Sequence, residues 1–212
     1  MSAFPLPREP TSWRSPCIHP AAAAIVSLLL AASGVVLLGQ GLWIHAKAML
    51  AQALLERAFN ATLASGQVVK PWPWADTWPI ARLEVPRLGK SAIVLHGSSG
   101  QALAFGPGHV ERTPDVGERG TAVYSAHRDT HFAFVGDIKI GDEIRMTRSD
   151  RATFRYRVTG MSVVRWDQSG IDAGAEGRQL ILSTCWPLDA KFSGPLRYLV
   201  RAEIANDATS DG

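Results

Sequence analysis

The first strong pattern in the chain is an uninterrupted apolar run over residues 21–44, which contains no charged residue. At 1.5 Å per residue, a helix over this run crosses a hydrocarbon core of about 30 Å. Trp43 stands near its end, where an aromatic residue suits the membrane interface. We therefore predict a membrane anchor over residues 21–44. A cleaved signal peptide is the alternative, but the apolar core of a signal peptide is shorter, about 7–15 residues.

The anchor also predicts on which side of the membrane each part lies. Arg8 and Arg14 precede the run, and Lys47 and Arg57 follow it, so the positive charges are almost balanced. A first hydrophobic span usually acts as a signal anchor for the large domain that follows it. We therefore predict a cytoplasmic tail at residues 1–20 and a large domain outside the cytoplasm.

Residues 45–77 connect the anchor with that domain. Ala46–Ala64 is rich in Ala and Leu and predicts a helical stalk, which ends at Ser65 and Gly66. A Pro-rich and Trp-rich linker follows. We expect its tryptophans to pack on the domain surface, with a role at the membrane interface or in a substrate groove as the alternative. They are Trp72, Trp74 and Trp78.

From residue 79 onward, short β-rich runs alternate with turn signals, and no amphipathic helix is predicted. The final run alternates well, since Tyr198 and Val200 share one face and Arg197 and Leu199 share the other. About eight runs predict a mostly β fold, a small closed barrel over residues 78–205, with a flexible tail at residues 206–212. The predicted strands are Ile80–Val85, Ser91–Leu95, Thr121–Ala126, Glu143–Thr147, Thr153–Val158, Ser162–Trp166, Gln179–Thr184 and Leu196–Ile204.

Composition narrows the function classes. The 212 residues are 46% hydrophobic and 19% charged, as in folded proteins. The net charge is only +3, and the Lys and Arg residues are scattered, which gives no sign of a nucleic-acid surface. No cysteine pair has the spacing of a metal motif. We expect no cofactor and no metal.

The two cysteines fall on different sides of the anchor. Cys17 precedes the apolar run and Cys185 follows it, so in the predicted topology they cannot form a disulfide. Cys185 is then a free thiol in an oxidising compartment, where an unpaired cysteine calls for an explanation.

Three residues of the β-domain have the chemistry of a nucleophilic site. Cys185 and His127 each follow directly on a predicted strand, and Arg197 opens the last strand twelve residues after Cys185. An imidazolium and a guanidinium both favour the reactive thiolate; the imidazole can then protonate a leaving amine, and the guanidinium suits an oxyanion. On spacing alone, a packed cysteine and a structural histidine remain open alternatives.

Several segments resemble the motifs of one family, the sortases. Residues 182–185 (LSTC) are similar to the TLxTC signature, residues 126–132 (AHRDTHF) to the GHRDTHF segment, and residues 197–200 (RYLV) to the final R-Y-x-V strand. Residues 79–88 and the GPGH turn at 106–109 also resemble sortase segments. The resemblance covers about residues 78–204 in the right order, and it is strongest to the class GN sortases of Gram-negative bacteria. Leu182, Ser183 and Ala126 depart from the usual motif residues.

The resemblance implies a fold and an activity. Sortases are membrane-anchored cysteine transpeptidases with an eight-stranded barrel. They cleave an LPxTG-like C-terminal sorting signal after its Thr, hold the protein as a thioester and transfer it to an amine acceptor. By this resemblance Cys185 is the nucleophile, His127 the acid/base and Arg197 the oxyanion-stabilising group, while Thr184 either binds substrate or packs in its strand. The implied location is the inner membrane, with the barrel in the periplasm.

Other interpretations of these residues stay open at this point. Arg201 competes with Arg197, because both lie on one strand face. His127 and His131 are four residues apart, with His109 as a third candidate metal ligand, but that spacing suits a helix and the local pattern is strand and turn. For the whole domain, the alternatives are a catalytically silent barrel that binds an extended peptide, and a thiol protease.

Overall fold

The computed structural model describes residues 20–192 and 194–205. Cys17 and the predicted tails before residue 20 and after residue 205 lie outside the described residues. The chain divides into two compact units, with the boundary between Lys47 and Ala48.

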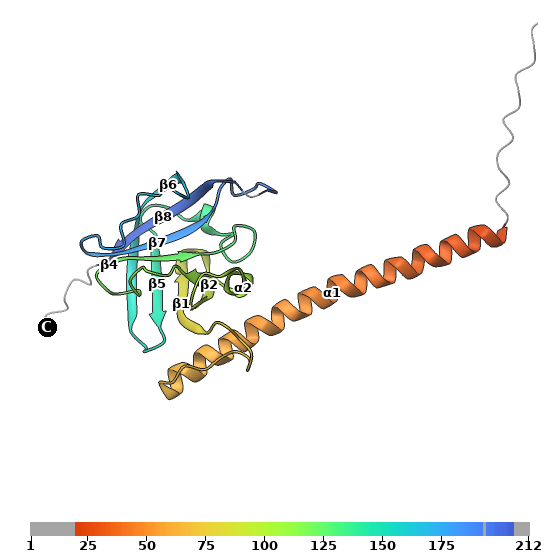
Figure 1. Ribbon diagram of the computed structural model, residues 1–212, viewed down its shortest axis with the longest axis horizontal. Coiled ribbons are helices and arrows are strands. Elements are labelled where there is room, and N and C mark those ends of the chain that lie inside the picture. The colour runs from red at the N-terminus through yellow and green to blue at the C-terminus, as the bar shows by residue number, and fades with distance from the viewer. Residues whose placement is uncertain (1–19, 193, 206–212) are drawn as a thin grey trace, which may run out of the picture. The chain divides into compact units, whose positions relative to one another are not determined.

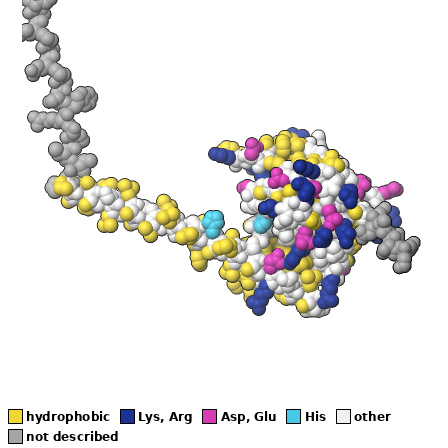
Figure 2. Space-filling view, turned by 180° about the vertical axis from the view of Figure 1, so that it is seen from behind, with side chains coloured by type: hydrophobic (Ala, Val, Ile, Leu, Met, Phe, Trp, Pro, Cys, Tyr) yellow, Lys and Arg dark blue, Asp and Glu magenta, His cyan; other side chains and the backbone are white. Residues whose placement is uncertain are grey.

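Helix α1 (Pro20–Ser65) joins the predicted anchor and the predicted stalk in one helix. In its first part the apolar side chains are exposed, such as Leu38 and Leu42, and Figure 2 shows them along the helix surface. Among the described residues, α1 is the one helix long and apolar enough to cross a membrane, judged by length and composition. It ends where the sequence predicts, because Gly66 adopts a left-handed conformation with φ 69°.

The last turns of α1 are an integral part of the second unit. Leu55 and Phe59 are fully buried in a cluster with Ile93, Leu95 and Ala102 of the barrel side. Burial of one such side chain contributes roughly 1.5–3 kcal/mol. The polar contacts around this cluster are an ion pair of Glu56 with Arg82 and two hydrogen bonds from Arg151 to the Leu63 carbonyl oxygen. The segment predicted as a stalk therefore packs against the barrel at this end.

The second unit is a closed eight-stranded barrel, which confirms the predicted fold (Figure 1). Around the barrel the order is β1-β2-β3-β4-β7-β8-β6-β5. The strands are β1 (Pro79–Val85), β2 (Lys90–Leu95), β3 (Gly108–His109), β4 (Gly120–Ser125), β5 (Glu143–Arg148), β6 (Thr153–Arg165), β7 (Arg178–Cys185) and β8 (Leu196–Ile204). The helices of this unit besides α1 are α2 (Gly100–Phe105) and the short 3-10 turns η1 (Pro86–Leu88) and η2 (Val135–Asp137).

The alternation of side chains along the strands builds two apolar layers. Inside the barrel, Tyr124 of β4, Leu182 of β7 and Val200 of β8 join the main core. On the outer face of the same three strands, Val123, Ile181 and Leu199 form a second buried cluster. Strands β4, β7 and β8 are thus held on both faces, which makes them a rigid platform.

Three details of the secondary structure differ from the prediction. The two strands predicted at Thr153–Val158 and Ser162–Trp166 are one strand, β6, with a register shift between Val158 and Gly160. The GPGH turn contains the two-residue strand β3. Ser99-Gly100 is one of the Ser-Gly pairs that signal a turn in the sequence, but α2 begins there, and the Ser99 hydroxyl accepts a hydrogen bond from the Ala102 N–H. The count of eight strands holds because one strand was predicted twice and one was missed.

Candidate active site

Strand register brings Cys185 and Arg197 together. β7 and β8 run antiparallel, and Cys185, the last residue of β7, is the direct cross-strand partner of Arg197. The β-carbons of such a pair lie about 5 Å apart, and both side chains project from the same face. The eleven residues between them therefore return the guanidinium to the side of the thiol.

His127 arrives at the same level from the other side. β4 and β7 run parallel with Ser125 opposite Ser183, and the ladder continues because the Ala126 N–H donates to the Ser183 carbonyl oxygen over 3.2 Å. Extrapolated by two residues from Ser125 and Ser183, this register puts His127 level with Cys185, one strand spacing of about 4.8 Å away. Cys185 thus stands on the middle strand, between a histidine on one side and an arginine on the other.

The three side chains belong to the outer face of the platform. Leu180 and Leu182 point into the barrel core, whereas Ile181 belongs to the outer cluster, so the alternation places Cys185 outside as well. Cys185 and Arg197 are half-buried and His127 is exposed. A peptide can therefore reach all three groups from the surface.

The contacts of these side chains leave them free to react. Among the described residues, neither Cys185 nor His127 forms a side-chain hydrogen bond or an ion pair with protein. Arg197 donates from Nη1 to the carbonyl oxygens of Gly194 and Leu196, each over 2.8 Å. These bonds orient the guanidinium without neutralising its charge, and its other N–H groups remain available to an oxyanion.

Thr184 points the other way, into the barrel. Its side chain is buried, with 3% of the residue exposed, and its hydroxyl donates to the Ala126 carbonyl oxygen over 2.7 Å. This bond ties β7 to the residue before His127. The burial favours the packing role of Thr184 over contact with a substrate.

Register also decides between the two arginines of β8. Arg201 lies opposite Ile181, four residues from Cys185 along β7. At about 3.3 Å per residue, this separation is roughly 13 Å. The structure brings Arg197 to the thiol and keeps Arg201 away from it.

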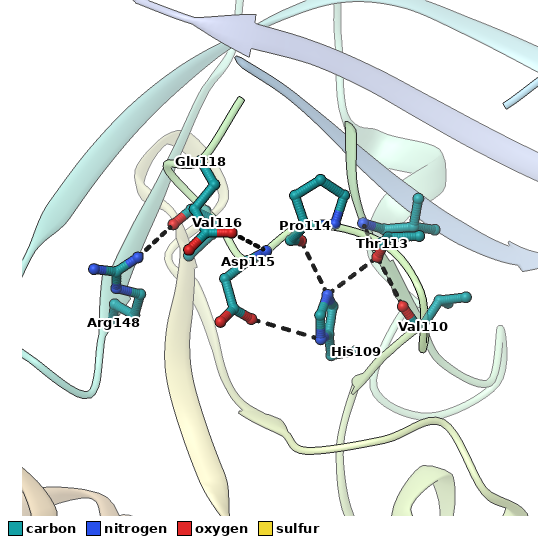
Figure 3. A network of polar contacts seen from close by, with 9 residues as sticks. His109, Val110, Thr113, Pro114, Asp115, Val116, Glu118 and Arg148 are labelled. Atoms are coloured by element: carbon teal, nitrogen blue, oxygen red, sulfur yellow. Dashed lines mark hydrogen bonds and ion pairs between the residues drawn. The ribbon is translucent and has the colours of Figure 1, made fainter. Parts of the chain in front are cut away.

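His109 lies in a separate polar network, drawn in Figure 3. Its Nε2 is 3.0 Å from the Pro114 carbonyl oxygen and 3.1 Å from the Thr113 hydroxyl, and its Nδ1 is 3.7 Å from the Asp115 carboxylate. These contacts hold the loop before β4, and they occupy the ring of His109 with structural partners.

His131 is the second histidine of the loop that carries His127, four residues further along the chain. Burial lowers the pKa of His131, and the neighbouring charge of His127 lowers it further, while a hydrogen bond to the Ala104 carbonyl oxygen acts in the opposite sense. The His131 imidazole is therefore biased toward its neutral form.

Three cavities of the second unit are lined by described residues away from the thiol. One of about 440 Å³ lies at the end of α1, one of about 420 Å³ is lined by Trp78, Tyr124 and Arg148 among others, and one of about 380 Å³ adjoins the loop around His109.

Comparison with known proteins matches this arrangement to one family. The sequence profile described as the sortase domain matches residues 83–205, more than half of the chain. The chain belongs to the sortase family. Sortase D of Bacillus subtilis (strain 168) is 32% identical over 119 residues, which are 56% of this chain and 60% of that protein. This chain therefore spans less than two thirds of that relative.

Solved sortase structures share the barrel. Sortase A from Corynebacterium diphtheriae superposes with a TM-score of 0.56 at 27% identity, over 66% of each chain. The Sortase D5 transpeptidase of Clostridium perfringens gives a TM-score of 0.59 over 74% of this chain and 99% of that chain, at 20% identity, and so supports the fold alone.

One residue of this sortase has a role that sequence reasoning missed. The sequence alone predicts that Arg128, next to His127, is a solvated loop charge. In the structure it is half-buried and donates from Nη2 to the carbonyl oxygen of Phe192 over 2.8 Å. Its Nη1 is buried and has no hydrogen-bond partner among the described residues. Arg128 thus joins the loop of His127 to the loop between β7 and β8. No local sequence signal marks this contact, because its partner is 64 residues away.

Proposed function

We propose that this sortase is a membrane-anchored cysteine transpeptidase, in which Cys185 is the nucleophile, His127 the acid/base and Arg197 the oxyanion-stabilising residue. One observation supports the proposal: Cys185 pairs with Arg197 across β7 and β8, and the register of β4 with β7, continued from Ser125 to His127, brings the histidine to the same level. A thiolate, a proton carrier and a fixed cation are the groups that acyl transfer through a thioester requires.

In the first step, the thiolate of Cys185 attacks the carbonyl carbon of the scissile peptide bond in an LPxTG-like sorting signal. The carbonyl oxygen becomes an oxyanion, to which the guanidinium of Arg197 donates. The C–N bond then breaks, and the imidazolium of His127 gives its proton to the leaving amine. The substrate protein is left as a thioester on Cys185.

In the second step, the amine acceptor attacks the thioester carbon. Neutral His127 takes the proton of the attacking amine, the C–S bond breaks, and the thiolate of Cys185 is released. The same imidazole thus acts once as acid and once as base. Water in place of the amine gives hydrolysis, the side reaction of this scheme.

The location and subclass are part of the proposal. The apolar first part of α1 supports a single-pass anchor in the inner membrane, with the N-terminus in the cytoplasm and the barrel in the periplasm. Residues 126–132 and 182–185 support membership of class GN. The partners are then a substrate protein with a C-terminal sorting signal and an amine acceptor.

A ligation assay tests the function. A soluble form should begin at Ala48, where the compact unit begins, because a later start removes the buried Leu55 and Phe59. It is incubated with an LPxTG-type peptide and an amine, and ligated product is measured by mass spectrometry. We expect ligation that Cys185→Ala abolishes. Hydrolysis without ligation would favour a thiol protease, and peptide binding without turnover would favour a silent barrel.

A further inference from the structure

The loop that carries His127 is short and is anchored at its far end. The Phe132 N–H donates to the His127 carbonyl oxygen over 3.1 Å, and Phe132 is fully buried in the core. The imidazole of His127 itself is exposed and has no hydrogen-bond partner among the described residues. Its position therefore depends on what holds the rest of the loop. A displacement of about 1 Å at a reacting group can cost 100-fold in rate.

His131 fastens this loop on one side. Its half-buried ring lines a small cavity of about 230 Å³ together with Gln52 of α1 and Lys90 of β2. The backbone of Ala104 in α2 also lies close enough to influence the pKa of the ring. Because His131 projects toward α2 and α1, it is placed to anchor the loop rather than to act as a second base.

The support under His131 is itself fixed. α2 is capped by Ser99, and Gln52 of α1 donates from Nε2 to the Phe105 carbonyl oxygen over 2.8 Å. Trp72 of the linker packs edge-on against the Phe105 ring with centroids 4.9 Å apart. The residue next to Phe105 in this helix is Ala104, whose backbone lies near the His131 ring. The side of α2 that His131 approaches is therefore held in place by α1 and the linker.

Arg128 fastens the loop on the other side. Its bond to the Phe192 carbonyl oxygen crosses to the segment that follows Cys185, and a charged donor makes such a bond stronger than a neutral one. Gly136, in η2 after the loop, lies so close to Leu188 that an added β-carbon would come within 2.8 Å of its Cδ1. The two loops beside the thiol are therefore connected by packing as well as by Arg128.

We propose that Arg128 and His131 are positioning residues that hold the imidazole of His127 beside Cys185, from the β7–β8 loop and from α2 respectively. The proposal rests on the proposed acid/base role of His127. Neither residue touches the reacting atoms in this scheme. Each acts by restricting the loop that joins β4 to η2.

The test uses the ligation assay with the form that begins at Ala48. Arg128→Leu and His131→Leu remove the two contacts but keep much of the side-chain volume. We expect each to lower kcat about tenfold, within the range that misplacement of a reacting group produces, with KM for the donor peptide within about twofold. His131→Gln and Arg128→Lys keep an N–H donor and should recover part of the loss. Two matched controls should leave kcat unchanged. They are Gln101→Ala, at an exposed position of α2, and Lys90→Ala, at the cavity that His131 also lines.

The outcomes separate the roles. Full kcat in both Leu variants would overturn the proposal, and so would losses of kcat that follow the melting temperature and are not recovered by the donor-keeping variants. The His127→Ala variant distinguishes a failure of the proposed function from a failure of the positioning roles. If it stays active, the proposed function itself fails. If it is inactive while the Leu variants are fully active, only the positioning roles fail.

Discussion

The two ends of β4 use the same kinds of side chains in opposite ways. In the loop before β4, the ring of His109 is engaged by Thr113 and Pro114 (Figure 3), and nearby Arg148, at the end of β5, is paired with Asp150. After β4, His127 has no side-chain hydrogen bond among the described residues, and Arg197 of β8 bonds only backbone carbonyls. Satisfied polar groups stabilise a loop, whereas unsatisfied ones at a surface are available to a substrate. The comparison separates structural from reactive residues by their partners, not by their type.

The largest effect expected from this comparison is at Cys185. Replacing it with Ala removes the nucleophile and should lower turnover by at least about 1,000-fold. Because the side chain is small and has no hydrogen-bond partner among the described residues, the melting temperature should change little. Turnover is measured by ligation of the donor peptide, and stability by thermal denaturation of the same preparation. Residual turnover near the unaltered level would contradict the assignment.

The two histidines should separate activity from stability. His127→Ala should lower kcat/KM by about 100-fold or more and leave the melting temperature unchanged. His109→Ala should leave kcat/KM within about twofold but cost about 1–2 kcal/mol of stability, because it removes the side-chain partner of the Pro114 carbonyl oxygen and one of the partners of the Thr113 hydroxyl. Urea denaturation measures the free energy of unfolding of each variant, and ligation kinetics measure its kcat/KM. A loss of activity in His109→Ala without a loss of stability would contradict the structural role of His109.

The two arginines on one face of β8 should differ in their effect on kcat/KM. Arg197→Gln removes the cation opposite Cys185 and should lower kcat/KM by about 100-fold, as the loss of one oxyanion donor does. Arg201→Gln changes the same strand face roughly 13 Å away, and we expect an effect within about threefold. Equal losses in the two variants would mean that charge along the strand, rather than a contact at the thiol, is what matters.

Much of the fold follows from sequence alone, because strand alternation is a local signal. The last strand was predicted at Leu196–Ile204, and β8 has those bounds. The misses occur where the local signal is weak. α2 has only Ala102 fully buried, too little for a helical period, and β3 is two residues held by pairing. In β6, Gly160 imitates a turn but marks a bulge within one strand.

The candidate site divides in the same way. Cys185, His127 and Arg197 could be found from the sequence because each stands at a strand end and has distinctive chemistry. The alignment of the three residues could not be predicted, because it depends on the pairing of β4, β7 and β8. From sequence, His131 is expected to shape the loop after His127 or to hydrogen-bond the imidazole, whereas Arg128 is expected to be a solvated loop charge. The contact of Arg128 cannot be predicted, because its partner, Phe192, belongs to another segment of the fold.

The smallest expected effect tests a paired arginine far from the thiol in sequence. Arg87 donates from Nε and Nη2 to the carboxylate of Asp142 over 2.5 and 2.7 Å, and the Lys139 N–H also donates to it. These bonds, led by that of Arg87, hold the pKa of Asp142 below its ordinary value. The lowered pKa stabilises the fold above the unfolded value of about 3.9, and this contribution is lost as the pH falls through the folded pKa.

Asp142→Asn should therefore lower the melting temperature by a few degrees at pH 7 and keep kcat/KM unchanged. The difference from the unaltered protein should shrink as the pH falls below about 3.9, because Asp142 then takes up a proton. Melting curves between pH 3 and pH 7 measure this directly. A difference that stays constant over that range would show that the Arg87–Asp142 charge does not stabilise the fold, and the contrast between satisfied and unsatisfied charges would not extend beyond the two ends of β4.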